Sequence, residues 1–79
     1  MDKNDLEVGK PYKTTANVKV CFYDKDDCLM PDMVDLQIGT KLTYVGPDND
    51  PDGGYVFQDM MDNTKFCFHD DDLASVEES

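Results

Sequence analysis

Apolar residues in this chain alternate with polar ones over short stretches, and no segment places three or more of them at helical spacing. In residues 17–23, for example, Val18, Val20 and Phe22 fall on one side of an extended strand. A period of two indicates a half-buried β-strand, whereas the apolar residues of a surface helix recur every three to four positions. The sequence therefore predicts an all-β fold.

Three further segments show the same alternation, at residues 41–45, 55–61 and 65–69. The acidic stretch 24–35, which contains Pro31, is predicted to be a long irregular loop. Residues 46–54 are rich in Pro, Gly and Asp and break the pattern, residues 62–64 form a tight turn, and a short helical turn begins near Asp70. Residues 1–9 are polar and predicted to fray, with Leu6 and Val8 tucked against the domain. The predicted core comprises Val18, Val20, Phe22, Leu36, Leu42, Tyr44, Phe57, Phe66, Phe68 and Leu73, with Val76 packing back near the end.

At 79 residues the chain has the length of one domain, predicted to span residues 1–79 with an ordered part of about 10–77. Five short strands must then share one small core. Closing the sheet into a barrel removes the unpaired edges. We therefore predict a small closed barrel, monomeric or weakly dimeric.

The segments VCFYD, LQIGTKLTYV, GGYVF, KFCFH and DDLASV follow one another in an order that resembles an SH3-like barrel over residues 17–77. The resemblance implies five strands with a long acidic loop after the first, and it places Tyr23 and Tyr55 in a peptide-binding groove. The chain lacks the groove Trp of that family, and His69 and Asp72 stand where a Pro and a Tyr are expected. An SH3-like adaptor that binds a peptide through aromatic residues is therefore kept as an alternative. The short, acidic, arginine-free composition also resembles small proteins encoded by phages and mobile elements.

The charge is strongly negative. Eighteen acidic residues, fifteen of them Asp, face seven Lys and no Arg, for a net charge of -11. Residues 41–79 contribute -8 of this and residues 1–40 contribute -3. Such a chain repels nucleic acid and anionic membranes and attracts basic proteins or cations.

We therefore predict a non-catalytic protein-binding module with an acidic surface. A narrower hypothesis is that this surface mimics nucleic acid and inhibits a basic, nucleic-acid-binding enzyme. The predicted partner-binding residues are Asp48, Asp50, Asp52, Asp59, Asp62, Asp70, Asp71, Asp72, Tyr23 and Tyr55. An acidic surface that serves solubility alone is the competing interpretation.

Residues 48–59 match the D-x-D-x-D-G spacing of a calcium-binding loop, with an acid at loop position twelve. The predicted ligands are Asp48, Asp50, Asp52 and Asp59, so a Ca²⁺-binding domain is a further alternative. Asp59 replaces the usual Glu, Pro51 stiffens the loop and the flanks are predicted strands, which favours a plain acidic turn.

The chain has three cysteines, Cys21, Cys28 and Cys67, and no C-x-x-C pair. Its first residues are charged and contain no apolar stretch. Both features predict reduced thiols and a cytoplasmic protein without a secretory leader. Cys67 and His69 stand two residues apart and could form a nucleophilic pair or, with Cys21, part of a metal site. No further Cys or His completes such a site except Cys28 in the predicted loop. The chain is therefore predicted not to be an enzyme.

Overall fold

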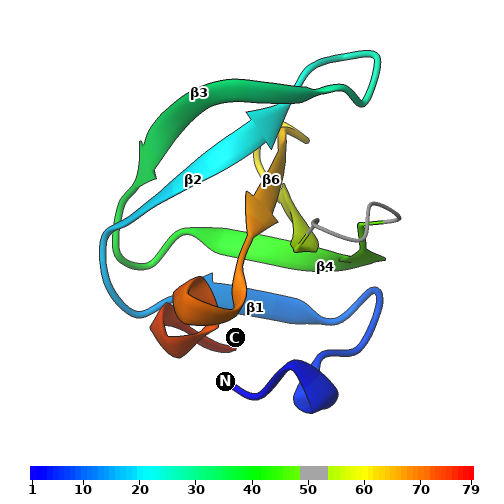
Figure 1. Ribbon diagram of the computed structural model, residues 1–79. Coiled ribbons are helices and arrows are strands. Elements are labelled where there is room, and N and C mark those ends of the chain that lie inside the picture. The colour runs from blue at the N-terminus through cyan, green and yellow to red at the C-terminus, as the bar shows by residue number, and fades with distance from the viewer. Residues whose placement is uncertain (49–53) are drawn as a thin grey trace.

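The computed structural model describes residues 1–48 and 54–79, in which the chain forms one antiparallel β-sheet (Figure 1). The predicted all-β fold is confirmed. In these residues the strands are β1 (Pro11–Thr14), β2 (Val18–Tyr23), β3 (Leu29–Leu36), β4 (Lys41–Pro47), β5 (Tyr55–Asp59), β6 (Lys65–Phe68) and β7 (Val76–Glu78). Within the described residues, two short 3-10 helices lie near the N-terminal and C-terminal ends, η1 (Lys3–Asp5) and η2 (Asp70–Ser75).

The strand order in the sheet is β3-β2-β6-β5-β4-β1-β7. Figure 1 shows a curled sheet, in which β2 and β3 run obliquely above β4 and β1. The edge strands β3 and β7 do not pair with each other within residues 1–48 and 54–79. The predicted closed barrel of five strands is therefore wrong in two respects, because the sheet has seven strands in this part of the chain and remains open.

β3 occupies most of the stretch for which the sequence predicts an acidic loop. Only residues 24–28 form a turn, in which Asp27 has a φ of 61°, and β3 then pairs along β2 from Leu29 to Leu36. As an edge strand it is mostly exposed, and Leu36 is its one buried residue. Because an edge strand needs few apolar residues and tolerates Pro31, its sequence carries little alternation.

One hydrophobic cluster holds the sheet together and receives a buried side chain from every strand described above. Its members are Tyr12, Val20, Leu36, Leu42, Tyr44, Phe57, Phe66, Phe68, Leu73 and Val76. The predicted core is confirmed at eight of its ten positions, while Val18 and Phe22 are only partly buried. Tyr12 on β1 is fully buried as well, although the sequence pattern does not indicate it.

Tyr12 also connects the N-terminal segment to the sheet. Its hydroxyl accepts a hydrogen bond from the Glu7 N–H at 2.9 Å and donates to the Asp5 carbonyl at 3.4 Å. Leu6 packs against the core as predicted, whereas Val8 is 70% exposed instead of tucked in. The segment predicted to fray thus contains η1 and contacts the domain.

Two irregularities shape the end of the β4–β5 hairpin. The register shifts between Tyr44 and Gly46, so that Val45 is an extra residue on β4 and its side chain is partly exposed. Gly46 has a φ of 142°, which side chains rarely adopt. At Gly54 a Cβ would overlap the carbonyl oxygen of Phe68, so only glycine allows β6 to approach this closely.

Candidate functional site

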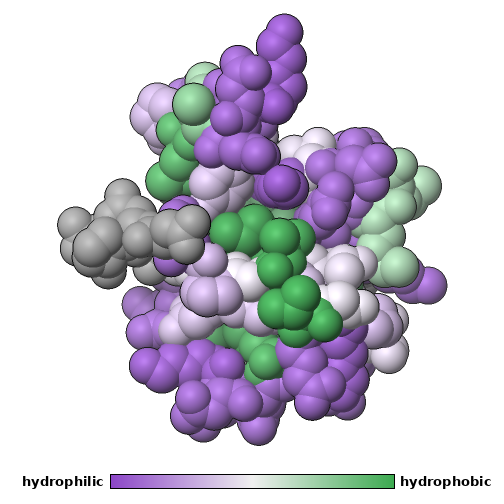
Figure 2. Space-filling view, turned by 90° about the vertical axis from the view of Figure 1, so that its right-hand side faces the viewer, coloured by the Kyte–Doolittle hydropathy of each residue, from purple (hydrophilic) through white to green (hydrophobic). Residues whose placement is uncertain are grey.

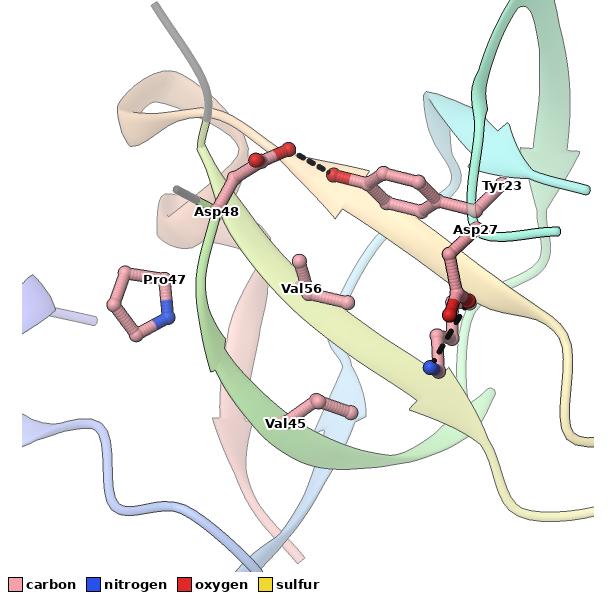
Figure 3. A pocket seen from close by; sticks show the side chains of 7 residues that line it. Tyr23, Asp27, Val45, Pro47, Asp48 and Val56 are labelled. Atoms are coloured by element: carbon pink, nitrogen blue, oxygen red, sulfur yellow. Dashed lines mark hydrogen bonds and ion pairs between the residues drawn. The ribbon is translucent and has the colours of Figure 1, made fainter. Parts of the chain in front are cut away.

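A pocket of about 160 Å³ lies where the end of β2 meets the bulged end of β4 (Figure 3). Tyr23 is the last residue of β2, and Asp48 directly follows β4. The Tyr23 hydroxyl donates a hydrogen bond of 2.5 Å to Asp48 Oδ2. We call this cavity the Tyr23 pocket; it is lined by Tyr23, Asp27, Val45, Pro47, Asp48, Val56 and Lys65.

The floor of the Tyr23 pocket is apolar and its rim is charged. Figure 3 shows Val56 and Val45 on neighbouring strands below the Tyr23–Asp48 hydrogen bond. On the rim, Lys65 Nζ lies 3.1 Å from Asp27 Oδ1. Figure 2 shows one face of the molecule on which apolar atoms gather between two hydrophilic areas. The pocket can therefore receive a group that is apolar along its length and cationic at its end.

Tyr23 remains a hydrogen-bond donor over a wide pH range. Burial raises the pKa of its phenol, and the neighbouring Asp48 carboxylate and Cys67 thiol raise it further. Each of these favours the neutral form, because burial and nearby negative charge both oppose ionisation. The phenol therefore holds the Asp48 carboxylate in place at the pocket rim.

A second hollow, of about 340 Å³, surrounds Tyr55 at the start of β5 and includes Asp70 and Asp71 of η2. The neighbouring Asp70 carboxylate raises the pKa of the Tyr55 phenol, and burial adds to this rise. Asp72 accepts the His69 N–H at 3.0 Å, which fixes the first turn of η2. Tyr55 and Tyr23 thus line different cavities and do not form one aromatic groove.

A third hollow, of about 490 Å³, lies beside the β5–β6 turn and is lined by Asp35, Asp59, Asp62 and Tyr23 among others. Asp59 accepts the Met61 N–H at 2.7 Å, and Asp62 accepts the Thr64 N–H at 2.9 Å. The Thr64 backbone bond lowers the pKa of Asp62. These carboxylates shape the turn and still present their charge to solvent.

The predicted acidic residues are therefore divided between the two ends of the β5–β6 ladder. Gln58 pairs with Lys65 at one end, and Tyr55 pairs with Phe68 at the other. The four paired positions span about 10 Å. Asp59 and Asp62 lie beyond the first end, and residues 70–72 beyond the second, so these acids flank the ladder instead of forming one continuous row. Asp50 and Asp52 lie outside the described residues.

The predicted calcium ligands are not all neighbours. Asp59 pairs with Leu42 near the start of β4, whereas Asp48 follows the end of that strand. The six positions between Leu42 and Asp48 correspond to about 20 Å of strand, too far for both carboxylates to bind one ion. The described part of the chain contains no group of three or more ligating side chains suited to a metal. Binding through Asp48, Asp50 and Asp52 stays a prediction.

Cys67 and His69 have different surroundings. Cys67 on β6 is buried and lies beside Tyr23, whereas His69 is exposed in the hollow around Tyr55. The backbone is still extended at His69, directly after β6. A nucleophilic pair of the two residues stays a prediction.

The lysines are distributed unevenly among the acids. Lys10 pairs with Glu7 and Glu78, at 3.9 and 2.6 Å, and Lys13 pairs with Glu77 at 3.4 Å. All three glutamates are thus in ion pairs, near β1 and β7. Within residues 1–48 and 54–79, the aspartates at positions 59, 62 and 70–72 form no ion pair. Among the described residues, other aspartates outside these ion pairs lie in the N-terminal segment and along the β2–β3 hairpin, at positions 2, 5, 24, 26, 32 and 35.

Sequence reasoning missed the apolar floor of the Tyr23 pocket and the Asp27–Lys65 pair on its rim. One signal was present: Val45 breaks the alternation of β4 immediately before Gly46 and Pro47. An apolar residue that follows the inward-facing Tyr44 directly must point to the other face, unless a bulge intervenes.

Comparisons with protein families, curated proteins and solved structures give no match to this chain. Within the described residues there is no helix with the length and apolar character needed to cross a membrane.

Proposed function

We propose that this chain is a non-catalytic protein-binding domain whose partner presents basic side chains. The observation that carries the proposal is the difference between the two acid types: within the described residues lysines pair with all three glutamates, while the aspartates at positions 59, 62 and 70–72 around β5 and β6 stay outside ion pairs. Carboxylates left in this state contribute little to folding. They do attract and orient a basic partner.

The Tyr23 pocket supports the same proposal. Lysine and arginine have long apolar stems with a charge at the tip. A stem would lie against Val45 and Val56, and the cation would meet Asp48 at the rim. A carboxylate offers about four acceptor positions, so Asp48 can accept the phenol of Tyr23 and a further donor together. Lys65 already shows a lysine at this rim, paired with Asp27.

A titration with a peptide of alternating arginine and glycine tests the proposal, followed by backbone amide shifts. The control peptide carries citrulline, which has the shape of arginine without its charge. We expect shifts around Tyr23, Val45 and Val56 with the arginine peptide alone, and weaker binding at high salt, because salt screens charges beyond about 10 Å at 0.1 M. Equal binding of both peptides, or no binding at low salt, would contradict the proposal.

Matched variants separate the pocket from general charge. Asp48→Asn and Asp71→Asn remove the same charge at different places. A charge-assisted hydrogen bond contributes about 1.5–3 kcal/mol, so we expect Asp48→Asn to weaken binding by about tenfold or more and Asp71→Asn to weaken it much less. Reversal of Asp70, Asp71 and Asp72 to Lys should abolish binding that depends on the whole acidic surface.

Mimicry of nucleic acid is the narrower form of this proposal, in which the partner is a nucleic-acid-binding enzyme. Acids at both ends of the β5–β6 ladder support it, since a mimic needs charges spread over a distance comparable to several phosphates. The test is whether a partner captured with this chain loses its binding to duplex DNA when the chain is added at physiological salt. Simultaneous binding of both would contradict mimicry and leave the wider proposal intact. A phage origin and an SH3-like relationship likewise remain proposals, which the composition and the order of elements support.

A further inference from the structure

Two of the three cysteines stand directly opposite each other in the sheet. In the antiparallel β2–β6 ladder Cys21 is the register partner of Cys67, next to the pair of Phe22 and Phe66. Directly opposed residues point to the same face of a sheet. Because Phe66 and Phe68 face the hydrophobic cluster, the side chain of Cys67 between them points to the opposite face, and so does that of Cys21.

The spacing of such a pair is close to that of a disulfide. Opposed residues on antiparallel strands have Cβ atoms about 4.5–5.5 Å apart and Cα atoms about 4.5–5.5 Å apart. A disulfide needs Cα atoms about 4.4–6.8 Å apart and Cβ atoms about 3.5–4.5 Å apart. The strands therefore have to approach by about 1 Å or less for the two sulfurs to bond. Cys28 lies in the turn before β3 and is opposed to no cysteine in the described ladders. In the β2–β3 ladder Cys21 is paired with Met33.

The two thiols differ in accessibility. Cys67 is only 1% exposed and lies beside the Tyr23 side chain, whereas Cys21 is partly exposed. A small oxidant can therefore reach Cys21 first, with Cys67 held next to it and shielded from solvent. A partly exposed cysteine with a second thiol beside it is the arrangement that forms disulfides through a sulfenic acid.

We propose that Cys21 and Cys67 are an oxidative modification site, at which a peroxide produces a disulfide between β2 and β6. In the first step the Cys21 sulfur takes one oxygen from hydrogen peroxide, giving a sulfenic acid and one water. In the second step the Cys67 sulfur attacks the Cys21 sulfur, the S–S bond forms, and the sulfenic oxygen leaves with two protons as a second water. Two thiols are oxidised by two electrons, and one peroxide is reduced to two waters. A dithiol reductant reverses the modification.

The test uses the Cys28→Ser variant, so that the exposed third thiol is absent. Dilute protein is treated with hydrogen peroxide, blocked with N-ethylmaleimide under denaturing conditions and measured by intact mass and peptide mapping. We expect the untreated variant to take up two labels and the oxidised variant none, with a mass lower by two hydrogens and a crosslinked peptide joining Cys21 to Cys67. The oxidised form should also melt at a higher temperature, because the crosslink restricts the unfolded chain. Dithiothreitol should restore both labels and the original melting temperature.

Cys21→Ser, made in the Cys28→Ser background, is the matched control, because the partly exposed position tolerates the change better than buried Cys67. It should show neither the mass loss nor the rise in melting temperature. The proposal is overturned if the oxidised protein forms only crosslinked dimers, if Cys21 proceeds to sulfinic acid with Cys67 still available to label after denaturation, or if oxidation lowers the melting temperature.

Discussion

Replacing Phe57 by leucine separates the contribution of ring packing from that of buried apolar area. Phe57 is fully buried on β5, and its ring centroid lies 5.8 Å from that of Tyr12, 5.1 Å from that of Tyr44 and 4.8 Å from that of Phe68. Its cross-strand partner Phe66 is also buried but takes part in none of these three ring pairs. The same substitution at the two positions removes a similar apolar area, but only at Phe57 does it also remove aromatic pairs.

The expected magnitude follows from the number of ring pairs. Each aromatic pair contributes about 0.5–1.5 kcal/mol beyond its buried area, so the three pairs at Phe57 contribute about 2–4 kcal/mol. The exchange of phenylalanine for leucine itself costs about 1 kcal/mol. We expect the free energy of unfolding to fall by about 3–5 kcal/mol in Phe57→Leu and by about 1 kcal/mol in Phe66→Leu. For a domain of this size the difference lowers the Tm of Phe57→Leu by at least about 8 °C relative to Phe66→Leu.

Urea unfolding followed by far-ultraviolet circular dichroism, together with thermal melts, measures these losses. Equal slopes of free energy against urea for the wild type and both variants would show that the folded and unfolded states are comparable. If Phe57→Leu and Phe66→Leu lose the same free energy, ring geometry contributes nothing here and the reasoning from the aromatic pairs is refuted.

Three other predictions concern single contacts. Thr14→Val removes a buried hydroxyl that accepts the Thr40 N–H at 3.0 Å and donates to the Gln37 carbonyl at 2.8 Å. We expect the free energy of unfolding to fall by about 1–2 kcal/mol and hydrogen exchange at the Thr40 amide to become faster. Thr14→Ser keeps the hydroxyl and should show neither effect. Gly54→Ala should unfold the protein or displace β6, because the new Cβ meets the Phe68 carbonyl. Gly39→Ala, at a φ of 87° with open space around it, should lower the free energy of unfolding by only about 1 kcal/mol. Thermal melts that show equal losses of stability for the two variants would contradict this. The pKa of Tyr23 is raised above its ordinary value of 10.0, so the neutral phenol stabilises the fold below pH 10.0, and this stabilisation is lost as the pH rises toward the pKa of the folded state. In urea titrations at alkaline pH, Tyr23→Phe should therefore lose less stability than the wild type as the pH rises. An identical loss in both proteins would be evidence against the raised pKa.

Strands with alternating apolar residues were predictable, and those without such alternation were missed. Alternation identified β2, β4, β5 and β6, whose buried residues include Val20, Leu42, Phe57 and Phe66. β1 has only one large apolar residue, and its second buried residue is Thr14. Because threonine counts as a polar residue, the sequence of β1 shows no alternation of apolar and polar residues. Whether a curled sheet closes depends on the geometry of its edges, on which alternation carries no information.

The candidate site was predictable in its composition and not in its arrangement. The excess of aspartate in the second half of the chain was visible, and so was Tyr23. The hydrogen bond from Tyr23 to Asp48 joins residues 25 positions apart. It depends on how β2 crosses the bulged end of β4, which no local pattern encodes. The opposition of Cys21 and Cys67 likewise depends on register, which is set by tertiary packing.

The open edge at β3 has a consequence for behaviour at high concentration. Within the described residues this strand of eight residues pairs with β2 on one side only, and its other edge is a template on which another chain could add and start a fibril. Pro31 offers no amide proton there, and the charges of Asp32 and Asp35 repel a second copy. Without these two charges only the proline opposes pairing, so we expect self-association through this edge to increase in a variant with Asp32→Asn and Asp35→Asn.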